Sequence, residues 1–239
     1  MTLKDKRVLV IGGGSGIGFG IAQGAAKEGA QVVIASRDAK KIAEAAQTIR
    51  ASSAAIDVRD ESNVAQFFKD HGTFDHIAFT AGDWDGVVPG ALADLDLAKA
   101  AGGLTTRFWG AVAVAKHGAT KLPPDGSYTI TNGMLAYKPR KGLPMVTAGA
   151  CAVEGLALGL AVDLAPVRVN CVCPGLIDTE IWDAFPEGYR ERLTAMAQKQ
   201  LVPRPGQPAE AAEAYLTCMR NSFLTGQTIK IEGGIALAG

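Results

Sequence analysis

The residues of this chain with the clearest chemical meaning are the glycines of the stretch IGGGSGIG, residues 11–18. Gly12 is followed by three residues and then by Gly16, Ile17 and Gly18, after a short apolar run and before a helical pattern. Glycines let the backbone approach a pyrophosphate, and the amino end of a helix offers free N–H groups. The stretch therefore predicts a dinucleotide-binding loop with contacts from Gly12, Gly14, Ser15, Gly16, Ile17 and Gly18. The alternative is a tight turn without a ligand.

The end of the next apolar run points to the kind of dinucleotide. It reads ASRD, with Ser36 and Arg37 where an acidic residue would bind a ribose hydroxyl. A guanidinium at this place suits a 2′-phosphate, so we expect NADP(H) rather than NAD(H). The alternative for Arg37 is an ordinary surface arginine.

Three further strand ends carry candidate cofactor contacts. Asp57 and Val58 follow the third apolar run and are expected at the adenine edge. Thr80, Ala81 and Gly82 end the fourth, where small residues leave room for a ribose. Pro174 and Gly175 end a later strand, and the polar Thr179 follows in a loop.

These positions share one edge of a sheet only if strands and helices alternate. The apolar periodicity predicts strands at 7–13, 31–37, 53–58, 74–82, 126–133, 167–175 and 226–234. It predicts helices at 16–28, 38–50, 61–72, 104–121, 147–164, 186–200 and 208–220. Alternation of this kind requires crossover connections, hence a doubly wound α/β fold with a parallel sheet and helices on both faces. Ligands of such folds bind at the carboxyl ends of the strands.

Composition excludes several classes of function. Lys plus Arg and Asp plus Glu number 24 each, and this balance favours neither nucleic acid nor an interaction tail. The apolar run near the N-terminus has four residues, too few for a signal peptide or a membrane span. Cys151, Cys171, Cys173 and Cys218 lack metal-type spacing and are expected as reduced core thiols in a cytoplasmic protein. No metal site is expected.

Taken together, these stretches resemble the short-chain dehydrogenase/reductase family. GGGSGIG is similar to its glycine loop, although Ile11 replaces the usual Thr, and TAG at 80–82 to its strand-end motif. LAPVRVNCVCPGLIDTE and TGQTIKIEGG are similar to its last two strands. The resemblance covers nearly the whole chain. It implies one NAD(P)-binding Rossmann domain over residues 1–239 with a seven-stranded parallel sheet. It also implies that the backbone of Ile177 and the Thr179 hydroxyl hold the nicotinamide carboxamide.

The same resemblance shows a departure at the catalytic positions. The family uses Ser, Tyr and Lys, the last two spaced Tyr-x-x-x-Lys, and these positions fall on Gly133, Val146 and Ala150. The chain does contain Tyr137-x-x-x-Lys141, but nine residues too early. Loss of an acid–base group slows a reaction typically by about 10²–10⁴-fold without preventing hydride transfer.

Two polar residues are candidates for the catalytic site. Arg107 stands where the family often has Asn, and its guanidinium can hold an anionic group or stabilise an oxyanion. Asn132 ends the fifth strand and can donate an N–H to a carbonyl. A structural role is the alternative for both, and Tyr137 is a less favoured proton donor. Apolar walls are expected from Trp84, Met134, Leu135 and Trp182.

The leading hypothesis is an atypical NADP(H)-dependent oxidoreductase. It would transfer a hydride between nicotinamide and a small carbonyl, imine or activated alkene. The alternatives are an inactive NADP(H)-binding sensor or partner subunit, and a non-redox lyase or isomerase on the same fold. Small residues in the helix 147–164 also suggest a homodimer or homotetramer, as the resemblance implies.

Overall fold

A single parallel sheet organises the chain. The computed structural model describes residues 2–82 and 92–238. Its seven strands are β1 (Arg7–Ile11), β2 (Gln31–Ser36), β3 (Ser52–Ala55), β4 (His76–Phe79), β5 (Ser127–Thr131), β6 (Arg168–Pro174) and β7 (Thr228–Ile231). They lie in the order β3-β2-β1-β4-β5-β6-β7, and every neighbouring pair is parallel. The chain reverses direction across the sheet between β1 and β4, and this switch point is where such sheets bind ligands.

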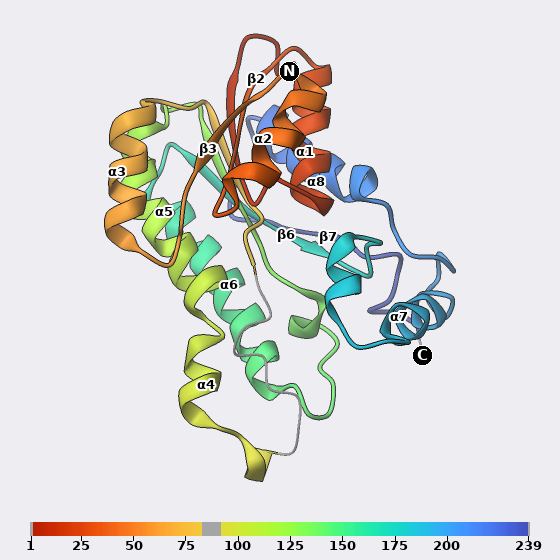
Figure 1. The fold of residues 1–239 in the computed structure, drawn as a ribbon. Coiled ribbons are helices and arrows are strands. Elements are labelled where there is room, and N and C mark those ends of the chain that lie inside the picture. Colours follow the sequence, from red (N-terminus) through yellow and green to blue (C-terminus); the bar gives the residue numbers. More distant parts are fainter. Residues whose placement is uncertain (1, 83–91, 239) are drawn as a thin grey trace.

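Helices cover both faces of the sheet (Figure 1). The main helices are α1 (Gly16–Lys27), α2 (Ala39–Ile49), α3 (Glu61–His71), α4 (Leu97–Gly102), α5 (Gly110–Gly118), α6 (Pro144–Asp163), α7 (Tyr189–Ala197) and α8 (Pro208–Arg220). One buried cluster joins the sheet to α3, α5 and α6. A second joins it to α1, α2 and α8. The expected doubly wound fold is confirmed.

Local sequence explains where several helices begin. The Asp38 carboxylate accepts from the Lys41 backbone N–H at 2.9 Å and caps α2. Asp60 caps α3 in the same way. Pro144 occupies the first turn of α6, where its missing N–H costs nothing, so this helix begins three residues earlier than predicted.

The predicted helix 104–121 is wrong as a continuous α-helix. Thr105–Trp109 form a π-helical turn, η2, before α5 begins at Gly110. The Trp109 N–H donates to the Leu104 carbonyl at 3.0 Å, five residues back. The π segment has only five residues, too few to show a period different from that of an α-helix, so the sequence pattern could not separate the two. Such π turns often occur at functional sites.

Other differences concern short or outward-facing elements. The six-residue helix α4 was not expected, because its pattern is too short to show periodicity. The helix predicted at 186–200 is shorter in the structure, where it is α7. It begins directly after Gly188, which has a φ of +79°. Cys151 is exposed on α6, contrary to the expectation that all four cysteines are core thiols, whereas Cys171, Cys173 and Cys218 are buried.

We predict that His76 makes stability depend on pH. This buried residue on β4 lies 2.9 Å from the Ser127 hydroxyl, and burial together with the Arg168 charge lowers its pKa to about 4. The unfolded chain, with a pKa near 6.5, binds the proton first. Stability therefore falls as pH drops from 6.5 toward 4. We expect a loss of about 2 kcal/mol in the free energy of unfolding between pH 8 and pH 5.

Urea titrations at the two pH values measure this difference. The His76→Gln variant should lose this contribution, and His71→Gln, which changes a less buried histidine, should retain it. An equal pH dependence in wild type and His76→Gln would contradict the prediction.

Candidate functional site

The glycine loop lies at the carboxyl end of β1 and is packed too tightly for side chains. A Cβ on Gly12 would lie 2.7 Å from both the Thr80 hydroxyl and the Ala81 nitrogen. A Cβ on Gly18 would lie 2.2 Å from the Gly12 carbonyl oxygen. Gly12 and Gly16 also have φ values of +89° and +52°, which glycine adopts readily. The loop therefore places backbone, rather than side chains, at the amino end of α1.

The residues that follow β4 complete this side of the site. Thr80 donates its hydroxyl to the Ile11 carbonyl at 3.1 Å, which ties the end of β4 to β1. Gly82 lies against Arg107, since a Cβ there would be 2.2 Å from the guanidinium Nη2. The predicted residues Thr80, Ala81 and Gly82 thus lie between the glycine loop and η2.

Ser36, Arg37, Asp57 and Val58 lie at the ends of β2 and β3. Ser36 is half-buried and Arg37 is exposed. The Asp57 carboxylate accepts from Arg59 Nε at 3.0 Å and Nη2 at 2.7 Å, and this arginine lowers the Asp57 pKa. Val58 is buried and its side chain meets Gly110 on α5. Side-chain contacts at this end therefore come from Ser36, Arg37 and the Asp57–Arg59 pair.

The loop after β6 approaches the glycine loop from the other side. Gly175 lies against the Glu232 backbone, where a Cβ would come within 2.6 Å. Ile177 is buried and pairs with Gly206. The Thr179 methyl group would be 3.1 Å from a Cβ on Gly16, so the two loops meet. Pro174 ends β6 directly before this loop.

Arg190 of α7 holds this loop in place, although the sequence alone gave no sign of it. Its guanidinium donates to Asp178 at 2.5 Å, to Asp183 at 2.7 Å and to the Thr179 carbonyl at 3.2 Å. The two carboxylates raise the pKa of Arg190, which stays charged. Its guanidinium also lies 5.6 Å from the ring centre of Trp182.

Arg107 on η2 meets Asn132 at the end of β5. Arg107 Nη1 lies 3.5 Å from the Asn132 carbonyl oxygen. The Asn132 side chain is 1% exposed, and neither its Nδ2 nor its Oδ1 has a hydrogen-bond partner among the described residues. A buried amide without partners requires an explanation, such as a bound polar group or water. The two candidate catalytic residues are therefore together, with unused hydrogen-bonding capacity beside them.

The positions that the resemblance aligned with Ser, Tyr and Lys are Gly133, Val146 and Ala150. Val146 is half-buried and Ala150 is 7% exposed, both on α6. No described atom lies within 4 Å of a Cβ built on Gly133, so there is open space above it. All three residues are small or apolar.

Tyr137 is engaged elsewhere. Its hydroxyl donates to the Glu154 carboxylate of α6, and the Lys230 ammonium lies 3.8 Å from its ring centre. Burial and Glu154 both raise the pKa of this tyrosine. Lys141 is exposed. The Tyr137-x-x-x-Lys141 pattern therefore does not place its hydroxyl beside Arg107 and Asn132.

The structure describes three of the four residues that were expected to form apolar walls of the site. Met134 Sδ lies 3.5 Å from Cys173 Sγ, and Leu135 is half-buried beside it. Trp182 is buried under Arg190. Trp84 lies outside the described residues.

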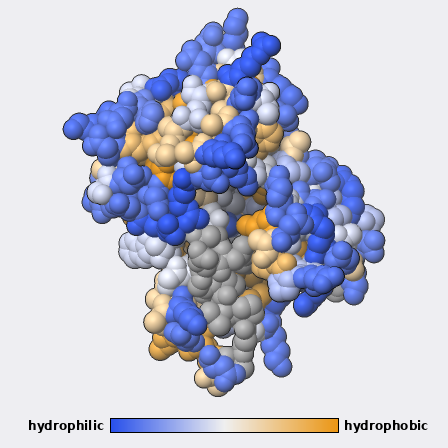
Figure 2. Space-filling model, viewed as in Figure 1, coloured by the Kyte–Doolittle hydropathy of each residue, from blue (hydrophilic) through white to orange (hydrophobic). Residues whose placement is uncertain are grey.

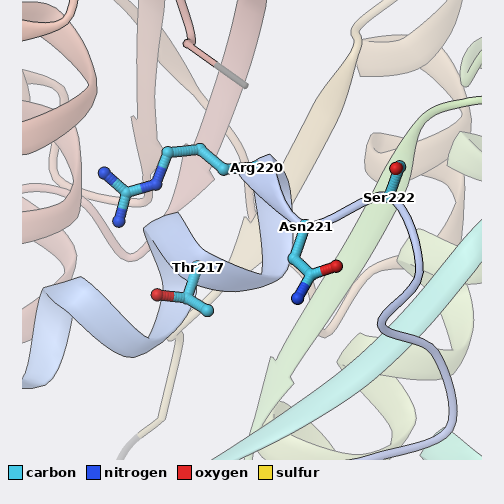
Figure 3. Close-up of a pocket in the computed structure, with 4 residues that line it drawn as sticks. All are labelled: Thr217, Arg220, Asn221 and Ser222. Carbon is cyan, nitrogen blue, oxygen red and sulfur yellow. The ribbon is translucent and has the colours of Figure 1, made fainter.

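Two surface hollows lie at the opposite edge of the sheet. One is lined by Thr217, Arg220, Asn221 and Ser222 at the end of α8 (Figure 3). Arg220 points away from Asn221 and Ser222 there, toward its carboxylate partners Glu28 and Glu213. The other hollow lies at the amino ends of β1, β2 and β3. Neither is at the edge where parallel sheets bind ligands.

The residues at the carboxyl edge fit a dinucleotide. The loop Gly12–Gly18 leaves backbone exposed to a pyrophosphate where side chains are sterically excluded. The Ser15 hydroxyl makes no capping hydrogen bond to α1. The candidate contacts at the ends of β2 and β3 and those at the ends of β5 and β6 lie on opposite sides of this loop. The two halves of a dinucleotide require such an arrangement.

The sequence of this chain is similar to those of known reductases and dehydrogenases. The family model described as enoyl-(acyl carrier protein) reductase matches residues 12–236. The short-chain dehydrogenase/reductase malC of Malbranchea aurantiaca is 34% identical, over 98% of this chain and 96% of its own. A relative from Gibberella fujikuroi, the short-chain dehydrogenase/reductase fsr5, is also 34% identical, over 99% of this chain and 96% of its own.

Two solved structures have a fold similar to that of this chain. The structure of MalC reductase/Diels-Alderase from Malbranchea aurantiaca has a TM-score of 0.89, covering 98% of this chain and 96% of that one. A small-chain dehydrogenase in complex with NADPH is 33% identical with a TM-score of 0.85, covering 98% of this chain and all of that one.

We predict that Gly18→Ala weakens nucleotide binding at least about tenfold, which corresponds to roughly 1.4 kcal/mol. The new methyl group would displace the Gly12 carbonyl and move the loop. Fluorescence titration with NADPH measures the effect. Gly133→Ala is the matched control, because its methyl group meets open space, and it should bind as wild type does. Unchanged affinity of Gly18→Ala would contradict the tight packing of the loop.

Proposed function

Because this chain belongs to the short-chain dehydrogenase/reductase family, we propose that it is an NADP(H)-dependent oxidoreductase with a non-standard active site. It transfers a hydride between nicotinamide and a small carbonyl, imine or activated alkene. The observation that carries this proposal is the contact of three loops at one sheet edge. The glycine loop meets Thr80 and Ala81 on one side and Thr179 on the other.

The preference for NADP(H) rests on the end of β2. Arg37 follows the last residue of this strand, and its charge contributes to lowering the Asp57 pKa, so the two groups are near each other. A guanidinium binds a phosphomonoester bidentately. The related small-chain dehydrogenase that was solved with NADPH supports this preference.

The chemistry follows from what the residues can do. Bound nicotinamide supplies or accepts the hydride. We assign the backbone of Ile177 and the hydroxyl of Thr179 to the nicotinamide carboxamide. Both residues lie in the loop that Arg190 fixes. Asn132 can donate from Nδ2 to a substrate oxygen or nitrogen. Arg107 places a permanent positive charge at the same point, where it stabilises negative charge developing on the substrate.

The proton must come from another source than the family's tyrosine. Val146 and Ala150 cannot ionise, and Tyr137 is held by Glu154 with a raised pKa. We propose that water or the substrate itself exchanges the proton. Substrates whose reduction needs little acid assistance are then favoured. The Malbranchea relative, named a reductase, supports a reductive direction.

We also propose a cytoplasmic homo-oligomer that binds neither nucleic acid nor a membrane. Helix α6 has the length and mean hydropathy, 1.8, of a membrane span, and 17% of that stretch is buried in the monomer. However, α6 packs on the sheet through Val153 and Ala157, so its exposed side is one face only. Pro144, Ala148, Cys151, Gly155, Leu158 and Val162 form that face at alternating spacings of four and three, which we call the α6 stripe. This is the spacing of a helix–helix seam.

Other features agree with a second copy on this side. Cβ atoms on Gly155 and Gly159 would meet no described atom within 4 Å, so the monomer's own packing does not require glycine there. Trp109 on η2 is 59% exposed, and Figure 2 shows further apolar surface around α4, which carries the exposed Leu97. A homodimer through the α6 stripe would cover these groups. The edge strand β7 offers a second surface for a tetramer.

We expect NADPH to bind in the micromolar range and more tightly than NADH, as measured by fluorescence titration. Oxidation of NADPH should then be detected with members of a panel of ketones, cyclic imines and enones. Arg107→Ala should lower kcat/KM by about 100-fold, because a charged donor at the reacting centre is lost. Arg220→Ala, at the opposite sheet edge, is the control and should leave kcat/KM unchanged.

The outcomes separate the alternatives. Tight NADPH binding without turnover of any panel member would favour a sensor or partner subunit. Product formation without change in nicotinamide would favour a lyase or isomerase. Failure to bind either nucleotide would overturn the proposal.

We predict that Gly155→Trp converts the oligomer to a smaller species, because the indole would fill the space that a partner's helix needs. Light scattering after size-exclusion chromatography gives the mass. Gly155→Ala should keep the wild-type mass, since a methyl group is tolerated in a helix seam. A monomeric wild type, or an unchanged mass of Gly155→Trp, would contradict the role of the α6 stripe.

A further inference from the structure

Asn132 differs from the other buried polar side chains of this protein. It follows β5 and is 1% exposed, yet neither its Nδ2 nor its Oδ1 has a hydrogen-bond partner among the described residues. Within the part of the chain that the structure describes, it is the one buried side chain with two atoms in this condition. Because an unpaired buried donor or acceptor costs free energy, such a group is expected where a ligand completes it.

Asn170 on β6 shows how the same side chain is accommodated in a structural role. Its Nδ2 donates to the Leu224 carbonyl at 2.8 Å, and its Oδ1 accepts from the Gln227 N–H at 3.1 Å. Asn170 is 0% exposed, so burial alone does not explain the unpaired amide of Asn132. The two residues differ in place. Asn170 lies within β6, whereas Asn132 lies at the carboxyl edge of the sheet, where parallel sheets bind ligands.

Open space lies beside Asn132, and its backbone is fixed. Gly133, the next residue, is half-buried, and no described atom lies within 4 Å of a Cβ built on it. The Asn132 N–H donates to the Val172 carbonyl at 3.1 Å, and the Asn132 carbonyl oxygen lies 3.5 Å from Arg107 Nη1. The main chain is therefore held on both sides, while the side-chain amide keeps its donor and its acceptor for another molecule.

We infer that the Asn132 side chain binds a cis amide of the substrate, as a lactam has. The ring of a lactam holds the N–H and the C=O on one side, so the carbonyl accepts from Nδ2 while the N–H donates to Oδ1. Exchanging Nδ2 and Oδ1 in Asn132 leaves this complementarity unchanged. The inference rests on the proposed function, because it names the substrate class of the same site. The reducible carbonyl, imine or alkene is carried on the same molecule.

Other polar groups would satisfy this side chain only in part. A ketone, an ester or an ionised carboxylate has no hydrogen to donate, so each would leave Oδ1 buried and unpaired. An open-chain secondary amide is trans and presents its N–H and its C=O on opposite sides. A primary carboxamide has the right edge but brings a second N–H, which needs a partner of its own. A site built to pair with a substrate N–H strongly rejects an analogue that lacks it.

The test uses the full-length protein saturated with NADP⁺ and the lactam 2-piperidone as the probe. Three compounds serve as comparisons. N-methyl-2-piperidone keeps the amide carbonyl without the N–H, cyclohexanone lacks the N–H without added bulk, and N-methylacetamide has a trans amide. Titration followed by NMR of the ¹⁵N-labelled protein gives the dissociation constants. We expect 2-piperidone to bind at least about tenfold more tightly than each comparison compound. It should also shift the side-chain amide signals of Asn132, which are assigned by their loss in Asn132→Leu.

Asn132→Leu should remove the preference for 2-piperidone over N-methyl-2-piperidone. The variant should unfold at the same temperature as the wild type or at a higher one, because the amide that it removes is unpaired. Asn170→Leu is the matched control. It should unfold at a lower temperature, because it leaves the Leu224 carbonyl and the Gln227 N–H without their partner. Circular dichroism on heating measures both.

Equal affinity of the wild type for 2-piperidone and N-methyl-2-piperidone would overturn the inference. A preference for 2-piperidone that persists in Asn132→Leu would also overturn it, since the lactam would then bind elsewhere. Both results would leave hydride transfer to other substrates open. Absence of NADPH and NADH binding would instead remove the proposed function itself.

Discussion

The approach of backbone to backbone at the glycine loop is the constraint on which the rest of this structure depends. The Gly12 carbonyl lies where a Gly18 side chain would be, and the Thr80 hydroxyl lies against both glycines. This packing joins β1, α1 and β4 at one point. It leaves the amino end of α1 accessible to an anion and brings the ends of β4 and β6 within reach of it. Any side chain here would separate these elements.

On either side of this point the chain uses different means to hold its ligand contacts. At the adenine end, Arg59 holds the Asp57 carboxylate, and the charge of Arg37 lies near it. At the nicotinamide end, Arg190 fixes the loop after β6 by bonding to two carboxylates and to the Thr179 carbonyl. Between them, Arg107 is carried on a π turn and touches both Gly82 and the Asn132 carbonyl. The function that we propose takes the polar groups of the reacting region from η2 and from the end of β5.

The sequence was informative wherever a short stretch determines its own geometry. The glycine spacing, the strand-to-helix alternation and the Asp38 cap are local, and the structure has each of them. Contacts that depend on how elements pack could not be predicted. The contact of the Lys41 side chain with Gly14 depends on the placement of α2. The position of Arg107 depends on a π turn of five residues, which is too short to be recognised from apolar spacing. The pattern Tyr137-x-x-x-Lys141 gives no hint that the tyrosine binds Glu154, seventeen residues later. Cys151 was misplaced because the outer face of α6 is uncovered in the monomer.

The anchoring of the segment after β5 has a consequence for how the chain matures during synthesis. Lys138 donates to the Ile235 carbonyl at 2.9 Å and to that of Ala238, residues that are translated 97 and 100 positions later. Tyr137 lies under Lys230 of the last strand. The glycine loop, by contrast, is in contact with β4 within the first 82 residues. A nascent chain can therefore assemble its nucleotide half well before the wall beside Asn132 is in place. The order of translation separates the assembly of the glycine loop from that of the contacts around Tyr137 and Lys138.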